Sequence, residues 1–326
     1  MNIDLFKKLF DEGCISETSF EKVKGTSRAT LFSLHWEIKT LLYLGVMLLS
    51  SGLGILIYKN IDTIGHQVIL LIIAAISAGC FFYCFKNKKP FSKDQVKSPN
   101  SFFDYILLLG CLSFLSFVGY LQFQYTVFGT NYGMATFIPM VGLFYIAYEF
   151  DHLGILAMGI TNMAIWMGVS VTPKQLLLNS DFNSQTVIFT YLFLGLLLLA
   201  AGYLTTYFSF KKHFRFTYQH FGVHLSFISL LAGYFFYHDS GLSLLFMVVL
   251  FALAIYIYKD AMKHHSFYFL LLLVIYTYIA ISSLVLRVIF SIKDDTSFTL
   301  SFMYFIASAI GIIFLLINLN KKIKAA

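Results

Sequence analysis

Three ionisable residues stand close together in the stretch YEFDH at residues 148–152, namely Glu149, Asp151 and His152. Carboxylates beside an imidazole can pass protons or hold a metal ion, and they are also common in hydrated turns. Long apolar runs flank the stretch on both sides. We expect a hydrated elbow between two membrane helices, in which the acids cap a helix or pair locally. The alternative is a metal site completed from elsewhere in the chain.

A second candidate group contains His220 and His224, which are four residues apart and share one helix face. Imidazole binds zinc, copper, iron or nickel. Glu149, Asp151 and His152 are predicted at the same, cytosolic membrane face, so the five residues form a candidate cytosolic cluster. The histidine pair lacks the Glu of the HExxH signature of metal hydrolases, and the sequence does not establish that the two segments touch. We therefore predict solvated interfacial histidines, with no metal and no cofactor.

Asn162 is the most deeply placed strongly polar residue of an apolar run, and Trp166 follows it by one turn. Together with Pro139 in the preceding run, these residues are a candidate midplane polar site, because a broken helix can offer backbone groups to a solute there. The alternative for Asn162 is a hydrogen bond between helices, worth ~0.6 kcal/mol. Nucleophile elbows, phosphate-binding loops and dinucleotide motifs are absent from the sequence. No catalytic residue is predicted, and an enzyme is the less favoured class.

The elements that must position these residues follow from composition. Of 326 residues, 59% are hydrophobic and 12% charged, with a mean hydropathy of +0.78, whereas soluble domains carry about 25% charged residues. A helix of ~20 apolar residues crosses a hydrocarbon core of ~30 Å. We therefore predict an all-α integral membrane protein of about ten transmembrane helices. The ten runs are 38–58, 65–85, 102–124, 129–148, 153–172, 186–208, 219–237, 241–258, 266–288 and 297–319.

The basic residues indicate an orientation. When the connections between ten spans are assigned alternately to two sides, 19 of the 23 Lys and Arg fall on one side. Basic residues are retained on the cytoplasmic side of a membrane, so both termini are predicted to be cytosolic. The net charge of +7 is then a sign of membrane topology. Nucleic-acid binding is a poor interpretation of this charge, because the basic residues lie in short connections and make no folded basic domain.

The N-terminal segment has a different pattern. Residues 3–11 have an apolar face opposite charged side chains, Gly13 is a plausible helix stop, and Ser16 is a plausible N-cap of a second short helix. Such a helical hairpin either packs on the membrane domain or docks a membrane or cytosolic protein partner. We predict a cytosolic amphipathic cap at residues 1–36 and a polytopic transmembrane domain at residues 37–326, in contact with the lipid bilayer.

Several stretches resemble a known family. The segment LFKKLFDEGCISETSFEKV precedes HWEIKTLLYLGVMLLSSGLGILI, and VFGTNYGMATFIPMVGLFYIAYEFDH and HFRFTYQHFGVHLSFISLLAGYFFYHDS follow later. Together they resemble bacterial multipass membrane proteins of the family named domain of unknown function 2157, in a Bacteroidota-type form. The resemblance implies an inner-membrane protein with an N-terminal cytosolic helical segment. It implies no activity and no functional residues.

A match between two segments of the sequence favours a transporter. At an offset of 150 residues, LYLGVMLLSSGLG lies over LFLGLLLLAAGYL, which aligns Gly45 with Gly195. Two inverted five-helix repeats, 38–172 and 186–319, would be a transporter plan with its site near the midplane. The alternative is chance alignment of two small-residue helices, because small residues favour close helix contact.

Three functions remain open from the sequence, of which a membrane-embedded metal enzyme, resting on the cytosolic histidines, is the least favoured. The first is a transporter-like carrier of a small or lipidic solute, favoured by the possible repeat. The second is a non-catalytic membrane sensor or assembly subunit that binds a partner through its N-terminal cap, favoured by the scarcity of buried ionisable groups.

Overall fold

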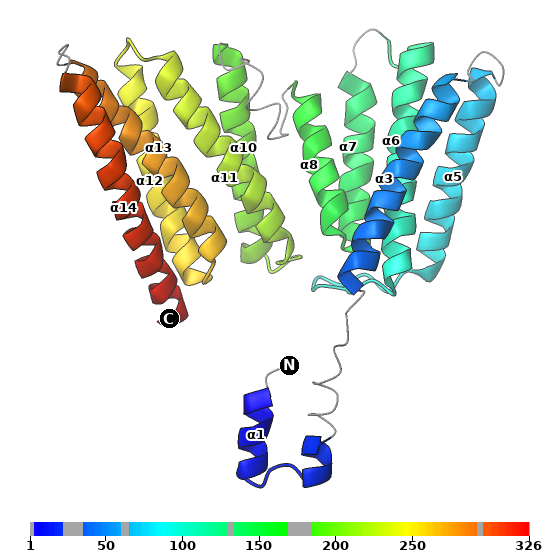
Figure 1. Cartoon of the computed structure of the whole chain (residues 1–326). Helices are drawn as coiled ribbons and strands as arrows, with labels where there is room; N and C mark the ends of the chain where they lie inside the picture. The colour runs from blue at the N-terminus through cyan, green and yellow to red at the C-terminus, as the bar shows by residue number, and fades with distance from the viewer. Residues whose placement is uncertain are drawn as a thin grey trace. The chain divides into compact units, whose positions relative to one another are not determined.

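The computed structural model of the chain describes residues 3–21, 35–59, 65–129, 133–168, 184–291 and 296–325. Within these ranges all regular secondary structure is helical (Figure 1). The all-α prediction is therefore confirmed for this part of the chain. Residues 1–2 and 22–34 of the predicted cap, residues 130–132 of the fourth predicted span and residues 169–172 at the end of the fifth lie outside the described ranges.

Each of the ten apolar runs falls on one helix. The helices are α3 (His35–Lys59), α5 (His66–Asn87), α6 (Ser101–Tyr125), α7 (Gly133–Phe150), α8 (Leu153–Trp166), α10 (Gln185–Tyr207), α11 (Phe214–Phe236), α12 (Leu242–Lys263), α13 (Phe267–Ser291) and α14 (Thr296–Ala325). The largest shift of a start is in α11, which begins at Phe214 although its apolar run was placed from residue 219. Its first turns carry Arg215, Gln219 and His220, so hydropathy alone misses them.

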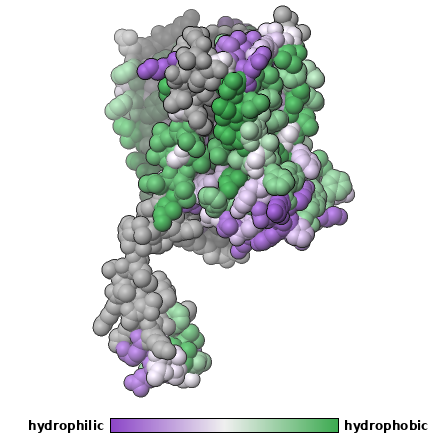
Figure 2. Space-filling view, turned by 90° about the vertical axis from the view of Figure 1, so that its right-hand side faces the viewer, coloured by the Kyte–Doolittle hydropathy of each residue, from purple (hydrophilic) through white to green (hydrophobic). Residues whose placement is uncertain are grey.

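Seven helices in the described part of the chain are long and apolar enough to cross a membrane: α5, α6, α7, α10, α12, α13 and α14. Shorter apolar stretches occur at Ile38–Leu49 in α3 and over α8. Many large apolar side chains on these helices are exposed. Figure 2 shows one face on which apolar side chains cover the middle of the helices and hydrophilic ones gather toward the ends. The chain is a multi-pass helical membrane protein, and the count of ten spans stays a prediction.

One compact unit contains residues 1–81 and 100–113. Its α1 (Ile3–Asp11) is followed by Gly13 with φ +72° and by a short helix at residues 17–21. The Ser16 Oγ accepts a hydrogen bond from the Ser19 N–H at 3.3 Å. Phe10 and Phe20 stack with their ring centroids 5.0 Å apart. The predicted stop and N-cap are thereby confirmed, and the second short helix is described through residue 21.

The second unit contains residues 82–99 and 114–326. In it α7 packs on α8, and α10 to α14 each pack on the next helix along the chain. Helix α11 also contacts α8 and α13, so it lies at the centre of this unit. We call the end of the unit that carries residues 82–99, 151–152, 208–213 and 264–266 the basic end. It is at the bottom of these helices in Figure 1.

Small residues bring α10 and α11 together. A Cβ added at Gly195 would lie 2.7 Å from the backbone N of Ser226, and one at Gly222 would lie 3.0 Å from the carbonyl O of Gly195. Small residues allow such close approach of membrane helices. Gly45, the predicted repeat partner of Gly195, has no such neighbour within 4 Å among the residues that the structure describes. The two glycines therefore differ in environment, and this pair gives the repeat no support.

Candidate functional site at the basic end

The elbow between α7 and α8 is tight. Helix α7 ends at Phe150, Asp151 has φ +61°, and His152 is the N-cap of α8. The Ile155 N–H donates to the His152 Nδ1 at 3.2 Å. The predicted helix cap is therefore supplied by the imidazole, while the Asp151 carboxylate turns elsewhere. Asp tolerates the left-handed backbone region better than most residues.

The prediction of a hydrated elbow is wrong for Asp151. Its side chain is fully buried, as is that of Lys211, whose Nζ lies 3.1 Å from the Asp151 Oδ2. The Val96 N–H donates to the same carboxylate oxygen. The His213 Nε2 contacts the other oxygen. The physical reason is that the α5–α6 and α10–α11 connections cover the elbow and supply partners that the elbow itself lacks.

Lys211 is held in place by its surroundings. Its backbone has φ +51°, and its N–H donates to the Lys93 carbonyl at 2.8 Å. Its Nζ lies 4.7 Å from the centre of the Phe91 ring, a cation–π distance. Burying two charges costs several kcal/mol per ion before pairing repays it. The Asp151–Lys211 pair therefore holds three connections in one arrangement.

Glu149 pairs with Lys88 at the end of α5, and both side chains are partly exposed. Lys88 also lies 5.2 Å from the centre of the Phe85 ring. A pair with this exposure contributes at most about 1 kcal/mol. Both acids of the elbow are thus paired with lysines from other connections.

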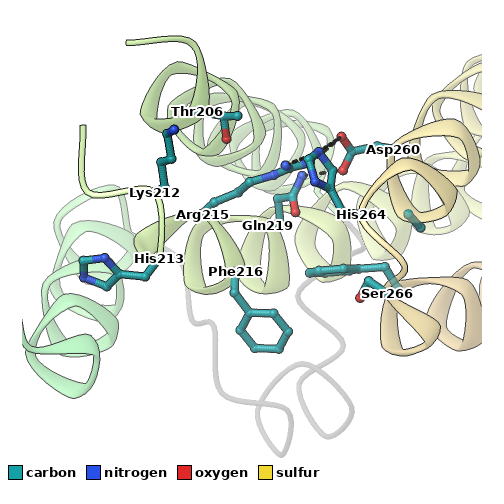
Figure 3. A pocket seen from close by; sticks show the side chains of 11 residues that line it. Thr206, Lys212, His213, Arg215, Phe216, Gln219, Asp260, His264 and Ser266 are labelled. Atoms are coloured by element: carbon teal, nitrogen blue, oxygen red, sulfur yellow. Dashed lines mark hydrogen bonds and ion pairs between the residues drawn. The ribbon is translucent and has the colours of Figure 1, made fainter. Parts of the chain in front are cut away.

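A pocket of about 400 Å³ opens beside this cluster at the basic ends of α10 to α13 (Figure 3). Arg215 pairs with Asp260, whose second oxygen accepts a hydrogen bond from the Gln219 Nε2 at 2.8 Å. Arg215 also contacts the His264 ring. Figure 3 shows Arg215 and Gln219 converging on Asp260, whereas His213 points away from them. We call this the basic-end pocket. Its lining is Thr206, Lys212, His213, Arg215, Phe216, Gln219, Asp260, Ala261, His264, Ser266 and Phe269.

His264 follows the last residue of α12 and is outside the apolar span. Burial lowers the pKa of His264, and the neighbouring Arg215 guanidinium lowers the pKa further, while Asp260 acts in the opposite direction. A neutral imidazole beside Arg215 can accept a hydrogen bond from it. The pocket therefore presents Lys212 and Arg215 as its permanent cations against the single carboxylate of Asp260.

The hydrogen-bond partners of His220 and His224 are tyrosines of α13 and not the acids of the elbow. The Tyr268 hydroxyl lies 2.6 Å from the His220 Nδ1, and the Tyr276 hydroxyl lies 2.6 Å from the His224 Nδ1. Helices α8 and α11 do contact each other. Within the described residues, however, no group of three or more His, Cys, Asp or Glu side chains is placed to hold a metal ion.

The predicted midplane residues lie on α7 and α8. Helix α7 runs unbroken through Pro139, which is buried. Asn162 is 7% exposed. Trp166 is half exposed and packs on Phe137 with ring centroids 5.4 Å apart. Because α7 is continuous, it exposes no helix ends of the kind that a discontinuous site needs.

The partners of the elbow were missed from the sequence, and one signal pointed to them. The α7–α8 connection is the one on its predicted side with acids and no Lys or Arg. Since a buried acid must be paired, a cation from another connection on that side was needed, but the sequence does not distinguish Lys88 and Lys211 from the other basic residues there. The pairing of Arg215 with Asp260 had no comparable local signal.

The comparisons with known proteins bear on the first part of the chain. Residues 7–156 match the family model described as predicted membrane protein (DUF2157). The resemblance stated from the sequence is thereby confirmed over this range, which runs from α1 into the start of α8. The DUF2157 match contains Glu149, Asp151 and His152, while α11 and the basic-end pocket lie beyond it. No curated protein and no solved structure matches the chain.

Proposed function

We propose that this membrane protein is transporter-like and binds a small or lipidic anion in the basic-end pocket. The observation that carries the proposal is the pocket itself: a 400 Å³ space lined by cations and aromatic rings at the end of the central helix. Ligand pockets commonly have 300–1,000 Å³ and a few polar groups in an apolar lining.

Helix α11 supports this proposal through its position. It is too polar to pass as a simple membrane span, yet it contacts four other helices. A helix facing lipid would gain nothing from Arg215, Gln219, His220 and His224, because polar groups in hydrocarbon are costly. Polar residues on a central helix of a membrane bundle typically line a solute path.

The lining of the pocket favours an anionic amphiphile. Lys212 is exposed and lines the pocket, so its charge is available to a ligand. The Nε of Arg215 is buried and has no hydrogen-bond partner among the described residues. Phe216 and Phe269 supply an apolar wall. A headgroup such as phosphate would contact the cations, since charge-assisted bonds to phosphate are the strong ones, and an alkyl chain would lie on the rings.

The membrane arrangement belongs to the same proposal. Ten spans would place both termini and the basic end in the cytosol of a bacterium, with the chain in the inner membrane, on the strength of the 19 basic residues on that side. An impermeant thiol reagent would test this on single cysteines at positions 93 and 322 in a cysteine-free chain. Labelling of either from outside intact spheroplasts would overturn the orientation. The inverted repeat of 38–172 and 186–319 stays a prediction.

Calorimetric titration tests the binding. The full chain in nanodiscs of zwitterionic lipid is titrated with hexyl phosphate, inorganic phosphate and hexanol. Hexyl phosphate is expected to bind about tenfold more tightly than either of the others, because both of its parts contribute. Equal affinity for hexanol and hexyl phosphate would contradict an anion site.

A matched pair of variants places the binding in the pocket. Lys212→Gln is expected to weaken hexyl phosphate binding about three- to fivefold, the worth of an exposed ion pair of up to ~1 kcal/mol. Lys259→Gln removes a charge that is also exposed but lies outside the pocket lining, and it should leave the affinity unchanged. If the two variants behave alike, the pocket is not the site.

A second candidate function is a non-transporting sensor or assembly subunit with a partner on the N-terminal hairpin. A closely packed helical core favours this candidate, because it leaves little room for a solute path. Between α11 and α13, Phe227 stacks on Tyr276 with ring centroids 5.2 Å apart. The apolar residues Phe6, Leu9 and Phe10 of α1 remain partly exposed. This candidate predicts that a solute binds without crossing the membrane. A counterflow measurement in proteoliposomes therefore separates it from the transporter-like function.

A further inference from the structure

Four side chains alternate between α11 and α13 in one hydrogen-bonded series. The Tyr268 hydroxyl lies 2.6 Å from the His220 Nδ1 and 3.5 Å from the His224 Nε2. The His224 Nδ1 lies 2.6 Å from the Tyr276 hydroxyl. The order is therefore His220, Tyr268, His224, Tyr276. Neither histidine is used by the basic-end pocket.

Each member of the series can both donate and accept a hydrogen bond. A neutral imidazole has one N–H and one bare nitrogen, and a phenol oxygen donates one proton while accepting another. All three contacts can thus point the same way: His220 Nδ1–H to the Tyr268 oxygen, Tyr268 O–H to the His224 Nε2, and His224 Nδ1–H to the Tyr276 oxygen. The reversed orientation satisfies the same contacts.

The two orientations differ by one proton transfer along each contact. A proton added to the His220 Nε2 lets the Nδ1 proton pass to Tyr268, the Tyr268 proton pass to the His224 Nε2, and the His224 Nδ1 proton pass to Tyr276. Each side chain that gains a proton gives one up, from the other ring nitrogen in a histidine and from the same oxygen in a tyrosine, so no member becomes a buried anion. The Tyr276 hydroxyl then releases its own proton to a water molecule at the α11–α13 interface, so the charge that enters at His220 leaves at Tyr276.

The series has a defined direction in the unit. His220 stacks on Phe216, which lines the basic-end pocket, with ring centroids 6.4 Å apart. Tyr276 is nine residues into α13 from Phe267, or ~14 Å along its axis at 1.5 Å per residue. That depth is about half of a ~30 Å hydrocarbon core.

The charged groups on the helices packed against α11 and α13 are not members of the series. On α11 and α12, Arg215 and Asp260 pair with each other, and His264 lies against Arg215. Helix α8 carries no titratable side chain, and those of α10 are tyrosines. On α13 the titratable neighbours are Tyr268 and Tyr276 themselves. No carboxylate of the described residues contacts either histidine, so the series itself must carry any proton.

We propose that His220, Tyr268, His224 and Tyr276 form a proton relay from the basic end to the middle of the α11–α13 interface. The relay is a second activity of the chain and does not rest on anion binding in the pocket. It would bring protons to a region of the bundle without a buried carboxylate.

Water-exchange NMR on histidine ring nitrogens of the purified full chain tests the relay. In the wild type, the ring protons of both His220 and His224 are expected to exchange with water. Tyr268→Phe removes only the bridging oxygen. It should slow exchange at His224 by about tenfold or more and leave exchange at His220 unchanged.

Tyr278→Phe is the matched control. Its hydroxyl joins α13 to Ser308 of α14 at 3.1 Å, so the variant also loses one phenol contact between helices but lies outside the series. Exchange at His224 should equal the wild type there. His220→Gln gives a second test if Tyr268→Phe does not fold, because an amide, unlike an imidazole, cannot take up a proton at one nitrogen and release one from another. Unchanged fast exchange at His224 in a folded blocking variant, or no exchange in the wild type, would overturn the relay.

Discussion

At the scale of single residues, Asp151 carries a buried charge whose partners come from other connections of the chain. Both partners of the Asp151–Lys211 pair are fully buried. Removing one charge of such a pair leaves the other buried without compensation, which costs about 3–5 kcal/mol. The consequence is a pair that fixes the elbow, the α5–α6 connection and the α10–α11 connection together.

Asp151→Asn should therefore lower the free energy of unfolding by about 3–5 kcal/mol. Asn tolerates positive φ as Asp does, so the change isolates the charge from the backbone. The measurement is unfolding of the purified chain in mild detergent by titrated denaturing detergent. Asp239→Asn is the control, because that side chain is fully exposed and should change nothing. Adding Lys211→Met to Asp151→Asn should recover much of the loss, and a double variant as unstable as the single one would contradict the pairing.

His264 gives a pH-dependent prediction. Its pKa is lowered by burial and then by Arg215, whereas an unfolded histidine has a pKa of about 6.5. As pH falls through about 6.5, the unfolded chain binds a proton before the folded chain does, so stability falls. Between about pH 7.5 and about pH 5.5, the free energy of unfolding should fall less in His264→Gln than in the wild type. An equal loss would show that the folded and unfolded pKa values of His264 do not differ.

At the scale of elements, the contact between α10 and α11 depends on Gly195. A methyl group there would meet the Ser226 backbone, which cannot move away as a flexible side chain would. Gly195→Ala should cost ~1–3 kcal/mol through overpacking. Gly45→Ala is the control within the same sequence match, because its Cβ has open space. There the change should be neutral or stabilising by up to about 1 kcal/mol. Unfolding of both variants measures this, and equal effects would refute the tight contact.

Helix positions could be predicted from the sequence, because continuous apolar runs determine where membrane helices form. The start of α11 could not, since its first turns are polar and are kept in place by Asp260 of α12. His220 and His224 could be placed on one face from their spacing. Their partners could not, because Tyr268 and Tyr276 are indistinguishable in sequence from the many other tyrosines of the apolar runs.

At the scale of the whole molecule, the central claim is that an anionic solute bound beside α11 moves across the membrane. The most direct measurement is counterflow of radiolabelled hexyl phosphate into proteoliposomes preloaded with unlabelled hexyl phosphate. We predict that the wild type accumulates more labelled hexyl phosphate than protein-free vesicles do. The double variant Arg215→Gln with Asp260→Asn keeps a polar contact between the two side chains but removes both charges. Its rate of hexyl phosphate uptake should be at least about tenfold lower. Lys259→Gln should transport as the wild type does. Accumulation no greater than in protein-free vesicles, or an unchanged rate in the double variant, would contradict the account.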